Sequence, residues 1–478
     1  MGVLENLEIA IPELILAASG LTLLMVGVFV GKNATRVVGG LSVISVAAAF
    51  LFVLMGSSDV ATTFGGMFIA DAFVRYAKLV TLLAVILALS LTLSWMAREQ
   101  IEKFEVPVLI IFAALGMLMM VSAHNLMVMY IGLELMSLAS YVLAAFRRDT
   151  LRSTEAGLKY FVLGSVASGM LLYGMSMVYG FTGTIAFETL SDVLAHNVST
   201  GVSVGLVFIV CGMAFKVSAA PFHMWTPDVY EGSPTPITAF FAVAPKVAAM
   251  ALFIRLLVGP FAAAVEVWQS VLWLVAVISM LIGAFGAIGQ TNIKRLMAYS
   301  SIGHMGYILV GLTAGSPEGI SAALIYLFLY IFMSVGVFAI ILSMRNGMQS
   351  FEAIDDFSGL SKVSPTLGWF LVILLFSMGG LPPLTGFFAK LSLIIAAVDA
   401  GHITLAIIMV MSSVVAAFYY IRLIKIICFD EPTETFDRPA TVDGFIIWGS
   451  GAVTLLFFVW LAPLIAQADA AAKVLFPG

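Results

Sequence analysis

The chain alternates long apolar segments with short polar ones, and this alternation limits its fold more than any other feature. Segments of about 17 to 25 apolar residues have the length that a helix needs to cross a bilayer. We count about fourteen of them, near residues 8–31, 36–56, 69–96, 107–122, 125–146, 157–181, 201–220, 234–258, 266–289, 294–314, 320–344, 364–397, 403–428 and 443–466. The chain is 62% hydrophobic and only 10% charged, whereas soluble domains carry about 25% charged residues. The sequence therefore predicts an all-α polytopic membrane protein.

Several functional classes are excluded by what the sequence lacks. The net charge of -5 forms no basic stripe of the kind that binds nucleic acid. No GxxxxGKS/T motif is present, and GAFGAIG at 283–289 lies inside an apolar segment rather than after a strand, so neither an ATP site nor a nicotinamide site is predicted. Five scattered histidines and the isolated Cys211 and Cys428 form no credible metal, haem or iron–sulfur cluster. We expect no cofactor in this chain, so its energy must come from another chain or from an ion gradient.

Basic residues between the apolar segments alternate from loop to loop. Loops of one parity carry Lys and Arg, as in the group Arg147, Arg148 and Arg152. Loops of the other parity carry almost none, although Arg255 borders one of them. Because cytoplasmic loops concentrate Lys and Arg, the basic set is predicted to be cytoplasmic, and both termini are predicted to lie on the opposite face.

Two of the expected spans are interrupted. The seventh contains CGMAFKVSAAPFH and the twelfth contains FSMGGLPPLTGFFAK, in which proline removes a backbone donor and adjacent glycines weaken the helix. Broken helices at membrane depth are tolerated where they line a cavity, and they recur in corresponding positions of transporter repeats. The sequence therefore predicts broken helices 7 and 12.

The two interruptions point to an internal repeat. Gly212 precedes Lys216 by four residues, as Gly386 precedes Lys390, and ASYVLAA in the fifth span resembles MGYILVG in the tenth. An odd number of spans separates the members of each pair, which reverses their orientation, so two inverted five-helix repeats are expected. Chance similarity between apolar helices is the alternative. The predicted divisions are helices 1–3 in residues 1–106, the first repeat in 107–258, the second, inverted repeat in 259–430, and helix 14 in 431–478.

Four charged side chains lie deep inside predicted spans, namely Glu134, Lys216, Lys246 and Lys390. A charge at the bilayer centre costs about 2.5 to 3.5 kcal/mol on insertion scales and is kept mainly where it faces a partner or a water-filled path. Glu134 is the one acidic residue well inside a predicted span, so it is the natural partner of Lys216. Burial lowers the pKa of a lysine and a nearby carboxylate raises it. The alternatives are a static ion pair for Glu134 and Lys216, and side chains that reach the membrane surface for Lys246 and Lys390.

Three further side chains could extend this polar line. Lys159 begins the sixth span beside the basic loop, where it could equally be one of the cytoplasmic charges. His223 and His304 could carry protons near neutral pH, and the alternative for each is a helix-to-helix hydrogen bond. A salt bridge at the membrane surface is expected among three charged residues near the outer end of the third span, Asp71, Arg75 and Lys78.

Residues 214–246, AFKVSAAPFHMWTPDVYEGSPTPITAFFAVAPK, resemble the proton-translocating membrane subunits of respiratory complex I, the NADH–quinone oxidoreductase. The same fold family includes subunits of multisubunit sodium/proton antiporters and of membrane-bound hydrogenases. Further matches are YIGLELMSLASYVLAAF, NIKRLMAYSSIGHMGY and GGLPPLTGFFAK, so the resemblance covers nearly the whole chain. The number of spans and the lysine at position 390 are similar to one particular type among the antiporter-like subunits of the bacterial enzyme.

The resemblance implies roles for the stranded charges. Glu134 is expected to pair with Lys216, Lys246 to join two half-channels, and Lys390 to be the terminal proton site, and Lys159 also matches a functional position of the family. Flavin, iron–sulfur clusters and quinone are expected on partner subunits, both membrane-embedded and peripheral. The resemblance further implies a bacterial inner membrane, in which the loop charges predict that both termini are periplasmic.

The predicted function is therefore proton translocation by a membrane subunit of a NADH–quinone oxidoreductase, whose redox centres lie on other chains. An alternative is a sodium/proton antiporter subunit driven by an ion gradient, which the composition and the broken helices fit equally well. A third possibility is a structural scaffold, for which replacing the buried lysines by methionine would spare activity. Neighbouring genes for flavin and iron–sulfur proteins, or instead for small antiporter subunits, would separate the first two.

Overall fold

The structure is a computed structural model that describes residues 7–432 and 435–476. Its helices are α1 (Ile11–Val30), α2 (Ala34–Met55), α3 (Ala72–Arg98), α4 (Glu105–Ser122), α5 (Leu126–Ala144), α6 (Leu151–Thr182), α7 (Phe187–His196), α8 (Thr200–Lys216), α9 (Trp225–Gly232), α10 (Thr235–Val258), α11 (Val265–Ile288), α12 (Ile293–Thr313), α13 (Pro317–Ser343), α14 (Leu360–Val363), α15 (Pro365–Gly379), α16 (Thr385–Asp399), α17 (Ile403–Phe429) and α18 (Thr441–Lys473). Short 3-10 turns are η1 (Leu7–Ala10), η2 (Gly31–Asn33), η3 (Ala262–Ala264) and η4 (Ile354–Phe357). Two antiparallel hairpins pair β1 (Ala61–Thr63) with β2 (Phe68–Ala70) and β3 (Arg345–Asn346) with β4 (Gln349–Ser350).

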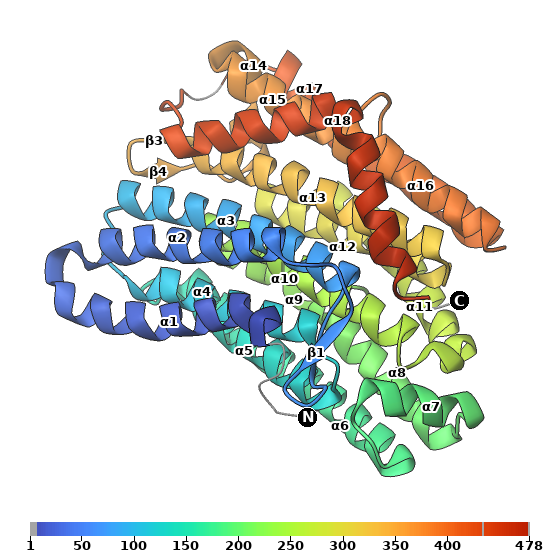
Figure 1. Ribbon diagram of the computed structural model, residues 1–478. Coiled ribbons are helices and arrows are strands. Elements are labelled where there is room, and N and C mark those ends of the chain that lie inside the picture. Colours follow the sequence, from blue (N-terminus) through green and yellow to red (C-terminus); the bar gives the residue numbers. More distant parts are fainter. Residues whose placement is uncertain (1–6, 433–434, 477–478) are drawn as a thin grey trace.

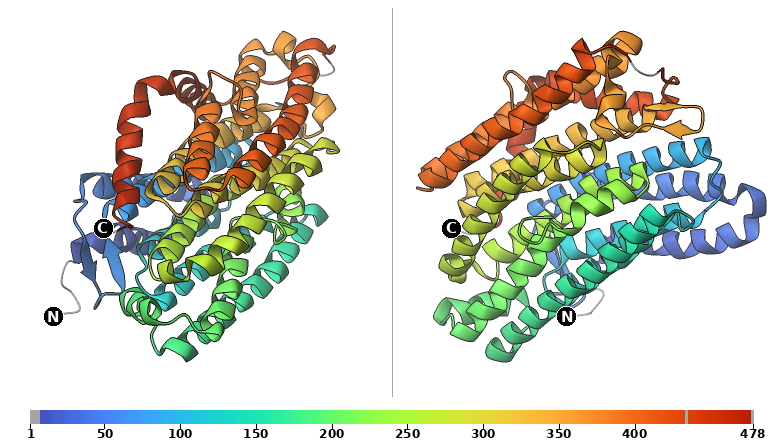
Figure 2. Two further views of the ribbon diagram at one scale, coloured as in Figure 1. Left: turned by 90° about the vertical axis from the view of Figure 1, so that its right-hand side faces the viewer. Right: turned by 180° about the vertical axis from the view of Figure 1, so that it is seen from behind.

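The long helices run roughly parallel to one another and form one bundle, with the β3–β4 hairpin at one end and α7 at the other (Figure 1). Helices α4–α6 and α15–α17 lie on opposite sides of a centre that contains α10, α12 and α13 (Figure 2). The residues in the most apolar part of α10 are all buried inside the chain, whereas 28% are buried in the span that contains α1 and 39% in α17. Polar side chains on α10 must therefore find their partners within the protein.

The described helices bear out an all-α polytopic membrane protein. Ten of them are long and apolar enough to cross a membrane, namely α1–α6, α10, α11, α13 and α17, and the two bent parts of α18 add an eleventh if they form one span. The count of about fourteen stays a prediction, which requires that α12 also crosses and that α8–α9 and α15–α16 each cross as one interrupted span. The division into inverted repeats also stays a prediction.

The helix is interrupted at both predicted places, between α8 and α9 and between α15 and α16. Pro221 and Pro382 lack the backbone N–H that would continue a helix, and Gly380 adopts a left-handed φ of 82° that glycine accommodates without strain. Breaks leave carbonyl groups unsatisfied. At the first break, the carbonyl of Phe215 accepts from the backbone N–H of Ser218 at 3.0 Å and from the Trp225 indole N–H at 3.1 Å.

Loops of the same parity meet at each end of the bundle. At one end, Glu352, in the loop after β4, lies 3.7 Å from Arg152 at the start of α6 and 2.7 Å from Lys294 at the start of α12. These three residues lie in or next to three different loops of one parity. At the opposite end, Asp71 pairs with Arg255 at 2.6 Å. This clustering is what alternating antiparallel spans produce, although which end faces the cytoplasm stays a prediction, and residues 1–6 and 477–478 lie outside the described residues.

The loop between the expected sixth and seventh spans contains a helix that the sequence analysis did not predict, α7. Its buried residues are Phe187, Leu190 and Leu194. A spacing of three and four residues places all three side chains on one helical face. The helix therefore packs that apolar face against the bundle and leaves a polar face outside.

Candidate functional site

Lys216 is the last residue of α8, so the helix break places its side chain inside the bundle rather than at a loop. The residue is only 6% exposed. Its Nζ donates to Ser137 Oγ on α5 at 2.8 Å and to Ser168 Oγ on α6 at 3.2 Å. The hydroxyl of Tyr141 on α5 lies 3.5 Å away. Hydroxyl groups from two neighbouring helices thus surround the ammonium group.

Glu134 approaches Lys216 through an intermediate side chain. Its Oε1 lies 3.9 Å from Lys216 Nζ, at the outer limit of an ion pair. Ser168 lies between them, since its hydroxyl accepts a hydrogen bond from Lys216 and donates a short one to Glu134. The structure therefore brings the predicted pair together. The bridging serine was missed, because it lies on another helix and nothing in its local sequence distinguishes it.

Lys246 lies in the centre of the bundle on α10 and is 1% exposed. Its Nζ donates to Ser301 Oγ on α12 at 2.6 Å, and Tyr330 on α13 donates to the same oxygen at 2.7 Å. The ammonium also lies 5.1 Å from the centre of the Tyr230 ring, a distance at which the ring attracts a cation. No carboxylate of the described residues forms an ion pair with Lys246. The free-energy cost of burying its charge is therefore offset only by neutral groups, the Ser301 hydroxyl and the Tyr230 ring.

His304 on α12 has both ring nitrogens engaged by tyrosines. Its Nδ1 lies 2.7 Å from the hydroxyl of Tyr326, and its Nε2 lies 3.1 Å from the hydroxyl of Tyr420. The Tyr420 hydroxyl is in turn 2.5 Å from Ser300 Oγ. A histidine held in this way can accept a proton at one nitrogen and release one from the other.

Lys390 lies on α16 just after the second break and is 5% exposed. Its Nζ donates to the carbonyl of Gly379, which the break frees, at 3.0 Å, and to Ser413 Oγ on α17 at 2.7 Å. The centre of the Tyr307 ring lies 4.7 Å from Nζ. A side chain at Gly380 would collide with Lys390, because an added Cβ would lie 2.9 Å from its Cδ. The glycine thus makes room for the lysine.

One face of α12 connects the central lysine to the second broken helix. Ser301, His304 and Tyr307 recur at intervals of three residues, which places them on the same side of the helix. Ser301 contacts Lys246, and Tyr307 contacts Lys390, with His304 between them. Of the two predicted histidines, His304 is therefore the one that the structure brings to the buried lysines.

Lys159 and His223 lie elsewhere. The Lys159 ammonium is 2.7 Å from both Glu155 and Asp228, and its side chain is 42% exposed. His223 lies in the first break, and its Nδ1 is buried without a hydrogen-bond partner among the described residues. The structure gives neither of them a hydrogen bond to a buried lysine.

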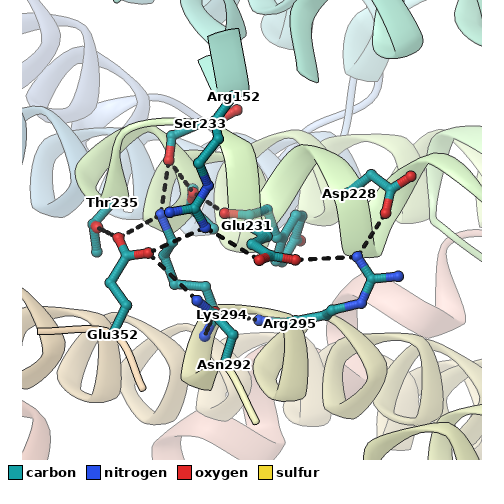
Figure 3. A network of polar contacts seen from close by, with 11 residues as sticks. Arg152, Asp228, Glu231, Ser233, Thr235, Asn292, Lys294, Arg295 and Glu352 are labelled. Carbon is teal, nitrogen blue, oxygen red and sulfur yellow. Dashed lines mark hydrogen bonds and ion pairs between the residues drawn. The ribbon is translucent and has the colours of Figure 1, made fainter. Parts of the chain in front are cut away.

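A network of charged side chains joins α6, α9, α12 and the loop after the β3–β4 hairpin (Figure 3). Arg295 bridges Asp228 at 2.6 Å and Glu231 at 3.1 Å, and Arg152 lies 3.1 Å from Glu231. A cavity of about 290 Å³ borders the network. Through Asp228, the network also includes Lys159. The structure therefore places Lys159 at the basic end of the bundle, about where the alternative interpretation expected it.

Glu352 joins this network through ion pairs with Lys294 and Arg152. Burial, the largest influence, would raise its pKa, but the charge of Lys294, a hydrogen bond from Lys294, the charge of Arg152 and a hydrogen bond from Asn292 together outweigh burial. The pKa of Glu352 consequently lies below its ordinary value. The carboxylate stays charged at neutral pH and holds the loop against α12.

The salt bridge expected among Asp71, Arg75 and Lys78 does not form. Lys78 pairs with Glu13 of α1 at 2.7 Å, and Asp71 pairs with Arg255. Arg75 donates instead to backbone carbonyls at the end of α2. The prediction was wrong because each side chain finds a partner on a helix distant in sequence. Glu13, a buried acid near the start of the first span, was missed altogether.

The cysteines and the metal-binding residue types are spread through the described part of the chain. Cys211 and Cys428 are free cysteines, and no group of three or more His, Cys, Asp or Glu side chains in that part could hold a metal ion.

Known proteins resemble this chain over nearly its whole length. The family model described as "NADH:quinone oxidoreductase/Mrp antiporter, TM" matches residues 123–416. The protein "NADH-quinone oxidoreductase subunit N" of Rhodospirillum rubrum is 54% identical over 471 residues, which cover 98% of this chain and 97% of that protein. Among solved structures, a chain of respiratory complex I from Thermus thermophilus is 30% identical with a TM-score of 0.83, covering 96% of this chain and 99% of that one. A chain of the Mrp complex from Dietzia sp. DQ12-45-1b is 24% identical, also with a TM-score of 0.83, covering 98% of both chains, and shares the fold.

Proposed function

The chain belongs to the family of NADH-quinone oxidoreductase subunit N, a membrane subunit of respiratory complex I, and from this membership we propose that it moves protons along its buried lysines. The subunit type agrees with the one indicated by the number of spans and by Lys390. The redox chemistry belongs to the complex, and we place flavin, iron–sulfur clusters and quinone on partner subunits.

The observation that carries the proposal is the set of three buried lysines in the bundle, two of which, Lys246 and Lys390, are joined along one face of α12. Lys216, Lys246 and Lys390 are each at most 6% exposed and are surrounded mainly by hydroxyl groups and aromatic rings. Only Lys216 has a carboxylate of the described residues within 4 Å. A stability role alone would favour fully paired charges or none, because breaking a buried pair costs about 3–5 kcal/mol and apolar replacement of a pair is often neutral.

Protons would pass from the Lys216 cluster to Lys246 and along α12 to Lys390. His304 and its two tyrosines supply groups that can both donate and accept between Lys246 and Lys390. At the other end of the line, movement of Glu134 towards or away from Lys216 would favour or disfavour the charged lysine. Redox energy from partner subunits would drive that movement.

Two parallels between the halves support the predicted inverted repeat. Lys216 lies 5.9 Å from the ring of Tyr141 and Lys390 lies 4.7 Å from the ring of Tyr307, and these tyrosines occupy the same position in the similar segments ASYVLAA and MGYILVG. Each lysine also adjoins a helix break. The halves differ at the carboxylate, because Ser300 occupies the place in α12 that Glu134 occupies in α5.

Sidedness and location complete the proposal. We place the chain in a bacterial inner membrane with the charge network of Glu352 at the cytoplasmic end, because that network gathers loops of the basic set. Both termini then lie on the periplasmic side. Protons entering from the cytoplasm would first reach the Lys216 region.

Replacing Lys246 by methionine in the assembled complex tests this function. We expect fewer protons to be taken up per NADH oxidised by proteoliposomes, because the central group that links the two broken helices is lost. The matched control is Lys362→Met, since Lys362 is partly exposed and pairs with Glu431 at the surface. An unchanged proton-to-electron ratio in a fully assembled Lys246→Met complex would favour a scaffold role instead.

The antiporter alternative has its own measurement. Sodium-driven proton movement in the same proteoliposomes without NADH would support it. The relatives at about half identity are named as oxidoreductase subunits, whereas the Mrp chain shares only the fold. We therefore expect no sodium-driven proton movement.

A further inference from the structure

A cavity of about 810 Å³ lies between the beginning of α1, the end of α2, the linker at 57–61 and the beginning of α3. This volume is in the range of sites that bind small molecules. The cavity is remote from the lysine line, being at the end of the bundle where Asp71 pairs with Arg255. None of the lysines or histidines of the proposed proton path lines it.

The charges around this α1–α3 cavity are only partly neutralised by one another. Lys78 is paired with Glu13 at 2.7 Å, and Asp71 with Arg255 at 2.6 Å. Three other charged side chains line the cavity without forming an ion pair among the described residues, namely Arg75, Glu8 and Asp59. The cavity thus offers one guanidinium and two carboxylates to a ligand.

Arg75 is held ready for an anion. Its guanidinium donates to the carbonyls of Val53 and Leu54 and to the hydroxyl of Ser58. All three acceptors are neutral, and a guanidinium has five N–H groups, so two remain for a further acceptor. Arginine matches the geometry of phosphate oxygens especially well.

The rest of the wall is apolar and faces away from the bundle. Leu51 and Phe52 line the cavity and are 54% and 51% exposed. Only 33% of the residues in the most apolar part of α2 are buried inside the chain. A ligand that combines a hydrocarbon part with a head carrying both an anion and a cation would match every part of this lining.

We propose that the α1–α3 cavity binds one phospholipid with an ethanolamine headgroup. The phosphate lies at Arg75, the primary ammonium lies between Asp59 and Glu8, and an acyl chain lies along Leu51 and Phe52. Phosphatidylglycerol offers no cation to the two carboxylates. Phosphatidylcholine offers a cation that cannot donate hydrogen bonds to them.

Photo-crosslinking of the intact complex tests this assignment. The complex is reconstituted in phosphatidylcholine with a trace of phosphatidylethanolamine that carries a diazirine in its acyl chain, and labelled peptides are identified by mass spectrometry. We expect labels within residues 48–61 and 70–78, and competition by unlabelled phosphatidylethanolamine but not by phosphatidylglycerol. Arg75→Gln should lower the labelling about tenfold, as expected for loss of a hydrogen bond to a charged group.

Asp59→Asn is the second variant, because Asp59 is an exposed linker residue whose replacement leaves the helices intact. It should remove the preference for phosphatidylethanolamine over phosphatidylglycerol while leaving NADH oxidation unchanged. Arg148→Gln, an exposed loop arginine outside the cavity, is the control and should label like the parent. Labelling that phosphatidylglycerol competes equally well, or that neither cavity variant alters, would overturn the proposal. So would a label increased by deletion of residues 1–6, because those residues would then be the occupant.

Discussion

Replacing Glu134 by glutamine removes one negative charge 3.9 Å from the Lys216 ammonium. The substitution is nearly isosteric, and the amide oxygen can still accept the hydrogen bond that Ser168 donates to Glu134. The change therefore isolates the electrostatic part of the pair. Position and packing of the three side chains should be kept.

The size of that electrostatic part decides whether the pair can drive transport. Two unit charges about 4 Å apart attract each other by about 4 kcal/mol at an effective dielectric constant of about 20. Moving one charge against 100 mV requires about 2.3 kcal/mol. The attraction between Glu134 and Lys216 is therefore comparable to the work of moving one proton against the membrane potential, so the pair can couple redox energy to transport. Glu134→Gln removes this coupling.

The assay measures proton uptake and NADH oxidation together in proteoliposomes that contain the assembled complex. We expect Glu134→Gln to lower the ratio of protons to electrons, because Lys216 loses the carboxylate that alternates its charge state. Ser168→Ala should have a smaller effect in the same direction, since it keeps both charges and removes only the bridge.

Glu155→Gln is the control for loss of a carboxylate. Glu155 lies on α6 with its side chain 55% exposed and pairs with Lys159 at the surface. It should leave the ratio unchanged. If Glu134→Gln behaved like this control in a fully assembled complex, the charge pair would be structural and the reasoning above would fail.

Three further predictions concern stability, each measured by thermal unfolding of the purified complex. Lys78→Met leaves the buried Glu13 carboxylate without its cation and with only the hydrogen bond from Ser122. The variant should cost about 3–5 kcal/mol, whereas the double variant with Glu13→Leu should recover most of that loss; equal destabilisation by both would contradict the pairing. Gly386→Ala would place a Cβ 1.8 Å from a backbone carbonyl of α15 and should destabilise the protein strongly, unlike Gly289→Ala, whose Cβ meets no atom within 4 Å. Because the folded pKa of Glu352 is depressed, its contribution is present above the ordinary glutamate value of 4.5 and is lost as pH falls through the lower folded value. Glu352→Gln should therefore lower stability at pH 7 and flatten the loss of stability on acidification, and an acid limb identical to the parent's would contradict this.

Local pattern was enough to predict much of this protein. Apolar length predicted the membrane-spanning helices, and proline and glycine predicted the breaks beside Lys216 and Lys390, because both signals act within one or two helical turns. The cost of burying charge identified Glu134, Lys216, Lys246 and Lys390 as functional candidates. The family resemblance then indicated that these residues form a proton path.

Pairings between helices could not be predicted from the same patterns. Ser168 between Glu134 and Lys216, and Glu13 beside Lys78, lie on helices whose relative rotation is set by packing of side-chain ridges into grooves. Residues on one helix face are known from spacing alone, but the face that meets them is not.

The sequence by itself determined that the chain crosses a membrane, where its helices break, and which charges are stranded. Only the tertiary structure decided what those charges contact: a serine bridge for Lys216, a hydroxyl for Lys246, and one face of α12 leading to Lys390. The physical reason is the difference between interactions along the chain and contacts between helices. Apolar runs and helix breakers act along the chain, whereas an ammonium group selects its partners across helix interfaces, over distances of 3 to 4 Å that no spacing in the sequence records.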